Sequence, residues 1–227
     1  MRLGLRASTR RTRTCGGRTT PGVESDEPAG EGVNHSNVPR GALGARVRRV
    51  RLERGLTLRD TERQTGVSRS MLSKIERGRA SPTATVLGKL AEGLKISISQ
   101  LIGGPVAIAR RHPVLLRVKN QPVFRVARTG FERRSLSPVG RGRTVDLVVN
   151  ILPPGQSSGE FPPHRAGVRE TLAVSAGQLQ LVLGRRKFKL GAGDAIFYGA
   201  DVGHRFDNPS ATDPAVFYIV IDYSRVG

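Results

Sequence analysis

The spacing of apolar residues divides this chain into a helical part and a β part. From Leu43 to Ile102, apolar residues recur every three or four positions, as they do in amphipathic α-helices. Beyond Pro122 the period changes to two, which is typical of strands with one buried face. We therefore predict a multidomain α plus β protein, with an N-terminal five-helix bundle and a C-terminal antiparallel β-barrel.

The first and fourth helices are predicted from their apolar faces and end signals. The first helix begins near Leu43 and ends at Gly55. The fourth starts at Ser81-Pro82, because serine is a favoured N-cap and proline is favoured at the first helical position. The first helix is expected to bury Leu43, Val47, Val50 and Leu52; the fourth is expected to bury Leu87, Leu90, Ala91 and Leu94, and a short fifth helix covers 98–102.

Two further helices are joined by a tight turn. Thr57 is predicted to cap a helix over 58–64, Gly66 to provide the turn, and Ser68 to cap a helix over 69–77. Two short helices joined by a three-residue turn inside such a bundle form a helix-turn-helix, a module that reads DNA.

Charge supports a polyanionic partner for the first two thirds of the chain. The formal net charge is +20, from 38 Lys+Arg against 18 Asp+Glu. Residues 41–104 carry 13 basic and 5 acidic side chains, and residues 105–145 carry 10 and 1, whereas 146–227 carry 8 and 8. This distribution favours double-stranded DNA as a partner of the front domain and a different role for the neutral C-terminal domain.

The composition also excludes several classes of protein. Cys15 is the single cysteine, so the chain has neither a disulfide framework nor a Cys-rich zinc site. No apolar run approaches the length of a membrane span. We expect a soluble cytoplasmic protein that does not associate with membranes.

Four segments are predicted along the chain. Residues 1–38, rich in Arg, Thr and Gly, are expected to be a disordered tail, either a nonspecific DNA-contacting arm or an extension from a misplaced start codon. Residues 40–103 form the helix-turn-helix domain and 104–121 a basic linker. Residues 122–227 form the β domain.

The predicted helix-turn-helix resembles that of the phage-repressor-like XRE family. The resemblance covers 44–102 and rests on the run GVSRSMLSKIERG over 66–78, followed by Ser81-Pro82-Thr83. It implies that the helix beginning at Arg69 lies in the DNA major groove, with its N-terminal residues facing base edges. It also implies a structural ion pair between Arg51 and Glu76.

This geometry assigns two groups of DNA contacts. Arg69 is expected to contact guanine bidentately, and hydroxyls, cations and backbone amides at helix starts and turns to hold phosphates. The exposed side of the reading helix presents Arg69, Ser70, Ser73 and Lys74, and the phosphate contacts are Thr57, Ser68, Arg79 and Thr83.

One position departs from the XRE pattern. Family members usually carry Leu-Ala in the second helix, where this chain has Thr61-Glu62. Glu62 must bend to solvent or find a cation such as Arg69, and that pairing would compete with guanine readout. The alternative interpretation is a helical bundle that binds protein rather than DNA.

Nine short strands with evenly spaced turns predict a closed or double-sheet antiparallel barrel. Turn sequences such as Pro153-Pro154-Gly155 separate them. The predicted strands are 123–128, 131–136, 144–151, 170–174, 178–183, 187–190, 195–198, 204–208 and 215–222.

Residues 122–222 resemble a cupin, a double-stranded β-helix, and together with the preceding module they resemble XRE–cupin regulators. His164, Glu170 and Gly177 fit the first cupin motif, in which Ala166 replaces the second histidine. The second motif is matched by Gly193, His204 and Asn208, with Gly199 and Asp201 in place of its Pro and Gly.

The cupin resemblance implies a ligand or metal site at His164, Glu170 and His204. Two histidines and one carboxylate can hold Zn or Fe, and Mn is a further candidate, although Ala166 removes one ligand of the usual set. Alternatively, the two histidines line the barrel and hydrogen-bond a ligand or each other. The aromatic residues expected in the core or pocket wall are Phe197, Tyr198, Phe206 and Phe217.

The function predicted is that of a dimeric, sequence-specific transcriptional regulator with no catalytic residues. Dimerisation is expected through the β domain, because one reading helix contacts only a few base pairs. The cupin domain would sense a small-molecule effector. The alternatives are a cupin metalloenzyme, a dioxygenase or isomerase, with a DNA-binding passenger domain, and an antitoxin that binds a protein partner.

Overall fold

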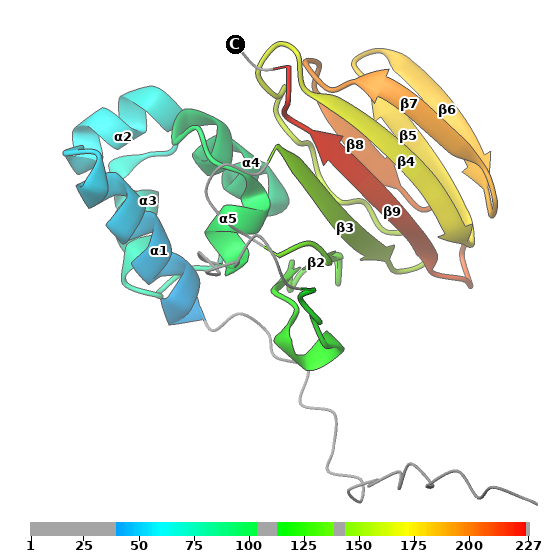
Figure 1. Cartoon of the computed structure of the whole chain (residues 1–227), viewed down its shortest axis with the longest axis horizontal. Helices are drawn as coiled ribbons and strands as arrows, with labels where there is room; N and C mark the ends of the chain where they lie inside the picture. Colours follow the sequence, from blue (N-terminus) through cyan, green and yellow to red (C-terminus); the bar gives the residue numbers. More distant parts are fainter. Residues whose placement is uncertain (1–39, 104–112, 139–143, 226–227) are drawn as a thin grey trace, which may run out of the picture. The chain divides into compact units, whose positions relative to one another are not determined.

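The computed structural model describes residues 40–103, 113–138 and 144–225 (Figure 1). The predicted tail at 1–38 and residues 104–112 of the predicted linker lie outside these ranges. Helices occupy the first part of the described chain and antiparallel strands the second, as the sequence predicted. None of the described helices combines the length and apolar character needed to cross a bilayer.

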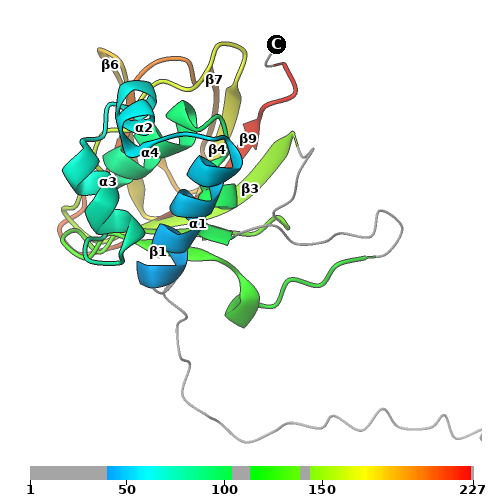
Figure 2. The ribbon, with the colours of Figure 1, turned by 90° about the vertical axis from the view of Figure 1, so that its left-hand side faces the viewer.

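Five α-helices lie within 40–103, and the predicted caps explain the boundaries of the second and third. Thr57 and Asp60 form a reciprocal capping box, Gly66 ends the second helix at φ 64°, and Ser68 accepts a hydrogen bond from the Met71 amide. The helices are α1 Arg40–Glu53, α2 Leu58–Thr65, α3 Arg69–Glu76, α4 Ala84–Gly93 and α5 Ile98–Gly103. Figure 2 shows α1, α2, α3 and α4 from a second direction.

The predicted start of the fourth helix is wrong. Thr83, not Ser81, caps α4, and its hydroxyl accepts a hydrogen bond from the Val86 amide at 3.2 Å. Two good capping residues lie two positions apart in the sequence, and Pro82 precedes the cap as a buried residue instead of opening the helix. The predicted buried face of α4 is confirmed, from Leu87 through Leu94.

The apolar face predicted for the first helix is wrong at Leu52, and Val50 is only half-buried. Leu52 is 55% exposed, whereas Arg51 is buried. Position 51 lies four residues after the fully buried Val47, so it shares that face of α1, while position 52 has turned away from it. The helix buries a charged residue here because Arg51 has a partner across the bundle, described below.

The C-terminal part consists of two antiparallel sheets rather than one continuous barrel among the described strands. The six-stranded sheet has the order β1-β2-β3-β9-β4-β7, and the three-stranded sheet has the order β6-β5-β8. The strands are β1 Val123–Arg125, β2 Glu132–Ser135, β3 Val145–Leu152, β4 Arg169–Ala176, β5 Gln178–Leu183, β6 Arg186–Gly191, β7 Ala195–Gly199, β8 His204–Asp207 and β9 Ala215–Asp222. A short 3₁₀ helix, Val118–Asn120, precedes β1.

Buried and exposed positions alternate along the strands, and some of the buried positions carry polar side chains that point into the β domain. In β9 every second residue from Ala215 to Ile221 is buried, and β9 lies between β3 and β4. The register places Glu170 opposite both Ile221 and Tyr198. Side chains opposite one another in a sheet share a face, so Glu170 and Tyr198 point into the same interior as the apolar core.

One of the aromatic residues predicted in the core lies on the surface. Phe197 is 61% exposed, and the Arg169 guanidinium lies 5.6 Å from its ring centre. Tyr198, the next residue, is buried, because successive side chains of a strand face opposite sides of the sheet. Phe206 and Phe217 are buried as expected, with ring centres 5.0 Å apart.

Candidate functional site

The first candidate site is the exposed surface at the start of α3. Arg69, Ser70 and Lys74 are exposed, and Ser73 is half-buried. The opposite side of the helix carries Leu72 and Ile75, which are buried in the bundle. The residues predicted to hold phosphates, Thr57, Ser68, Arg79 and Thr83, are all exposed, and three of them are N-caps.

The predicted partner of Arg69 is present. The Arg69 guanidinium lies 3.0 Å from the Glu62 carboxylate, which also accepts a hydrogen bond from the Arg69 amide at 3.2 Å. Glu62 therefore holds the start of α3 and its principal base-reading candidate together. In the free protein the pair must separate, at least in part, before Arg69 can donate both hydrogen bonds to a base.

We expect Glu62→Gln to strengthen DNA binding about threefold to tenfold, because it removes a competitor for Arg69 and one negative charge near the phosphates. Fluorescence anisotropy with a duplex from the upstream region of the protein's own gene measures the effect. Glu53→Gln, on the exposed side of α1, is the control and should leave affinity unchanged. Weaker binding by Glu62→Gln would mean that Glu62 orients Arg69 rather than restraining it.

The predicted ion pair between Arg51 and Glu76 is confirmed. Arg51 Nε and Nη2 donate to the two Glu76 oxygens at 2.7 and 2.9 Å, and Nη1 donates to the Leu56 carbonyl at 2.9 Å. Both side chains are largely buried, at 11% and 8% exposed. The pair joins α1 to the end of α3 and thereby fixes the helix that carries the candidate base contacts.

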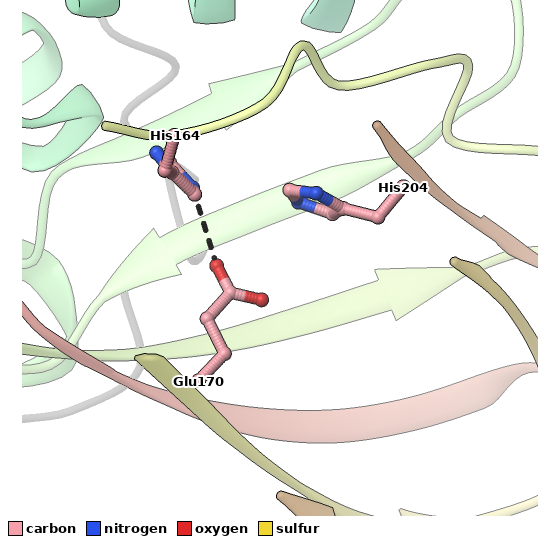
Figure 3. Close-up of side chains that lie close together, drawn as sticks. All are labelled: His164, Glu170 and His204. Carbon is pink, nitrogen blue, oxygen red and sulfur yellow. Dashed lines mark ion pairs between the residues drawn. The ribbon is translucent and has the colours of Figure 1, made fainter. Parts of the chain in front are cut away.

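The second candidate site brings together three residues that lie far apart in the sequence (Figure 3). His164 lies in the segment before β4, Glu170 on β4 and His204 at the start of β8. A ligand atom from each lies within 4.8 Å of the other two. His164 Nε2 is 3.3 Å from Glu170 Oε1, and all three side chains are buried.

Hydrogen bonds orient each of these three groups toward the other two. His204 Nδ1 donates to the Val202 carbonyl at 3.1 Å, which leaves its Nε2 as the available nitrogen. His164 Nδ1 lies 2.5 Å from Glu92 Oε1, so its Nε2 faces Glu170. The Tyr198 hydroxyl donates to Glu170 Oε2 at 2.5 Å. Such outer contacts fix the orientation of metal-binding side chains.

The protonation of the two histidines differs because their neighbours differ. Burial lowers the pKa of His204, consistent with a neutral ring that donates to Val202 through Nδ1. Burial would also lower the pKa of His164, but hydrogen bonds to Glu170 and Glu92 outweigh it and raise that pKa to about 9.

Glu170 is held as a carboxylate. Burial alone would raise its pKa, but interactions with His204 and His164 outweigh burial and lower the pKa to about 2. Burial and the negative charge of Glu170 raise the pKa of Tyr198, so its hydroxyl remains a donor. Without a metal, the site is thus the Glu170 carboxylate with His164, His204 and the Tyr198 hydroxyl as close polar neighbours.

This donor set fits a divalent metal ion. Two imidazole nitrogens and one carboxylate oxygen converge, and each group is oriented by an outer hydrogen bond. Ala166, which stands where the cupin pattern has a second histidine, is exposed. A bound ion would supply a Lewis acid with positions left for an oxygen or nitrogen of a ligand.

Sequence reasoning missed the outer partners of this site. Glu92 belongs to α4 of the helical region, 72 residues before His164, and no motif connects the two. Tyr198 was assigned only to the core or pocket wall. Asn208, singled out by its motif spacing, donates to the carbonyls of Leu152, Pro153 and Asp213 and thereby fixes a turn.

Comparisons with known proteins agree with both parts of the chain. A helix-turn-helix family model (HTH_3) matches residues 47–101, and a cupin domain model (Cupin_2) matches residues 148–221. The HTH-type transcriptional regulator SutR of Escherichia coli K12 is 29% identical over 183 residues, which cover 81% of this chain and 96% of SutR.

Two further relatives support the same assignment. An HTH-type transcriptional regulator of Sinorhizobium fredii, y4dJ, is 40% identical over 60 residues, 26% of this chain and 78% of the relative. The crystal structure of an HTH_3 family transcriptional regulator from Vibrio cholerae is 25% identical, covers 82% of this chain and 98% of that one, and superposes with a TM-score of 0.65. With its XRE-type helix-turn-helix followed by a cupin domain, this chain belongs to the HTH-type transcriptional regulators that bind DNA.

Proposed function

We propose that the protein binds a two-part operator as a homodimer in the cytoplasm and senses a small molecule in its cupin domain. The observation that carries the DNA-reading part is the exposed start of α3, where Arg69, Ser70 and Lys74 surround a capped helix N-terminus. Backbone amides at such an end can hold a phosphate while neighbouring side chains reach base edges. Dimerisation supplies a second α3 helix, which reads the second half-site.

A gel shift combined with metal analysis separates this proposal from the cupin metalloenzyme. The purified full chain should retard a duplex from its own upstream region in excess nonspecific DNA. The metalloenzyme alternative is favoured instead by stoichiometric iron or manganese in a protein that retards no duplex.

We propose that the triad of His164, Glu170 and His204 takes a divalent ion, with zinc as the probe. His204→Ala should weaken zinc binding at least about a hundredfold in calorimetric titration, because it removes one of three ligands. His112→Ala, remote in sequence from both cupin motifs, is the matched control. Equal zinc affinity in wild type and His204→Ala would place the bound zinc elsewhere.

We propose that Glu92 couples the cupin site to the helix-turn-helix domain. It lies on α4, and its second oxygen is 3.9 Å from Arg165 Nε. One turn earlier, a Cβ at Gly88 would come within 2.6 Å of the Pro162 ring, so α4 and the segment carrying His164 approach closely. A ligand that moves the His164 ring must therefore also change the contact with α4.

We expect saturating zinc to change the DNA affinity of the wild type, and Glu92→Gln to remove most of that change. The amide still accepts one hydrogen bond but cannot match the carboxylate as a partner for His164. Fluorescence anisotropy with and without zinc measures the response. Glu160→Gln, an exposed glutamate paired with Arg205, is the control. A full zinc response in Glu92→Gln would exclude this route.

A further inference from the structure

Two polar side chains are buried opposite one another inside the β domain. Arg133 on β2 is 4% exposed and Asn150 on β3 is fully buried, and they are direct partners in the strand register. Residues paired in this way point to the same face of a sheet. On β3, that face also carries the fully buried Val148 and Leu152, so both polar groups face the interior.

Neither side chain is satisfied by the described residues around it. Arg133 Nε and both amide atoms of Asn150, Oδ1 and Nδ2, are buried without a hydrogen-bond partner among them. The neighbouring carboxylate, Glu132, accepts from Arg125 and Arg134 instead. A buried donor or acceptor without a partner costs about 1–3 kcal/mol, so an arrangement with two such donors and one such acceptor indicates that something else completes it.

The interior that holds this pair also holds the triad. Asn150 on β3 lies opposite Phe217 on β9, which in turn lies opposite Val174 on β4, the strand that carries Glu170. The apolar surroundings are aromatic: Asn150 lies opposite Phe217 in the register, and Phe217 contacts Phe206. A ligand here would meet the guanidinium of Arg133, the amide of Asn150 and two rings, in an interior that also holds the carboxylates of Glu170 and Asp146.

We propose that Arg133 and Asn150 form a subsite for a small monocarboxylate, the effector of the cupin domain. A guanidinium binds a carboxylate through two parallel hydrogen bonds, and the Asn150 amide can add a third. Glu170 disfavours a second negative charge on the ligand, so a monoanion fits better than a phosphate dianion. The short apolar part of the ligand packs against Phe217 and Phe206. This assignment of ligand class rests on the sensing role proposed above.

The test uses thermal unfolding of the full chain with acetate, propionate and benzoate as probes, in EDTA so that no metal contributes. The corresponding amides, acetamide, propionamide and benzamide, test the need for charge, and inorganic phosphate tests the need for a monoanion. At about a hundredfold excess over the dissociation constant, at least one carboxylate should raise the Tm of the wild type by several degrees. Its amide and phosphate should not.

Variants assign the binding to this pair. Arg133→Gln should weaken binding of the carboxylate probe about tenfold or more. Arg134→Gln, one residue along β2 and paired with Glu132, should leave that binding unchanged. If Arg133→Gln does not fold, Asn150→Asp provides the same test, because a carboxylate there repels the ligand. The proposal is overturned if no carboxylate stabilises the wild type, if phosphate or the amide stabilises equally, or if the folded variants bind as the wild type does. A gel shift without any probe reports DNA binding separately.

Discussion

Glu76→Ala is expected to destabilise the helix-turn-helix by about 3–5 kcal/mol, because it leaves Arg51 as a buried cation with no carboxylate partner. The bidentate contact joins α1 to the end of α3, and both side chains are largely buried. A domain of this size has about 5–15 kcal/mol of stability, so the loss is a large fraction of the total. DNA binding should fail as a consequence, although Glu76 itself touches no DNA in the proposed geometry.

Urea denaturation followed by far-ultraviolet circular dichroism measures this effect. Glu53→Ala is the matched control, because the Arg49–Glu53 pair on α1 is half exposed on both sides and should contribute less than about 1 kcal/mol. Equal losses in the two variants would show that the Arg51–Glu76 pair has no special role in positioning α3.

Arg69→Ala is expected to weaken binding to the specific operator about fivefold to 150-fold, or about 1–3 kcal/mol, and to relax the preference at one base pair. Arg69 is exposed at the first turn of α3, where a major-groove helix presents its base contacts. The effect exceeds that of a phosphate contact because a bidentate contact to the correct base is lost.

Competition binding against single-base operator variants and random duplexes distinguishes these roles. Arg63→Ala, an exposed arginine of α2 paired with Asp60, is the control. If Arg69→Ala weakens all duplexes equally, Arg69 contacts the phosphate backbone and its assignment to a base is wrong.

Much of the fold follows from local sequence patterns. The alternation of apolar residues predicted all nine strands, and the observed bounds of β5 and β9 coincide with the prediction. The predictions that proved wrong concern places where a local sequence rule fits two neighbouring residues equally well. Ser81 and Thr83 are both good caps, and only packing decides between them. On α1, Arg51 is buried instead of Leu52 because it pairs with Glu76, which lies 25 residues away in the sequence.

The candidate sites were predictable only in part. His164, Glu170 and His204 were found because a spacing pattern connects them, and the structure brings the three together. Glu92 and Tyr198 have no such pattern, since their contacts arise from tertiary packing. Arg133 and Asn150 looked like ordinary polar positions of strands, and only the register and burial place them inside the domain.

Selection of the full chain against random duplexes tests the regulator most directly, because one consensus reports both symmetry and base preference. A dimer that reads DNA through α3 should enrich an inverted repeat whose half-site centres lie about one helical turn apart, roughly 10–10.5 base pairs or a multiple of it. Glu62→Gln should select the same repeat with tighter binding, and Arg69→Ala should lose the preference at one position of each half-site. A pool that shows no enriched sequence after repeated rounds would contradict the account.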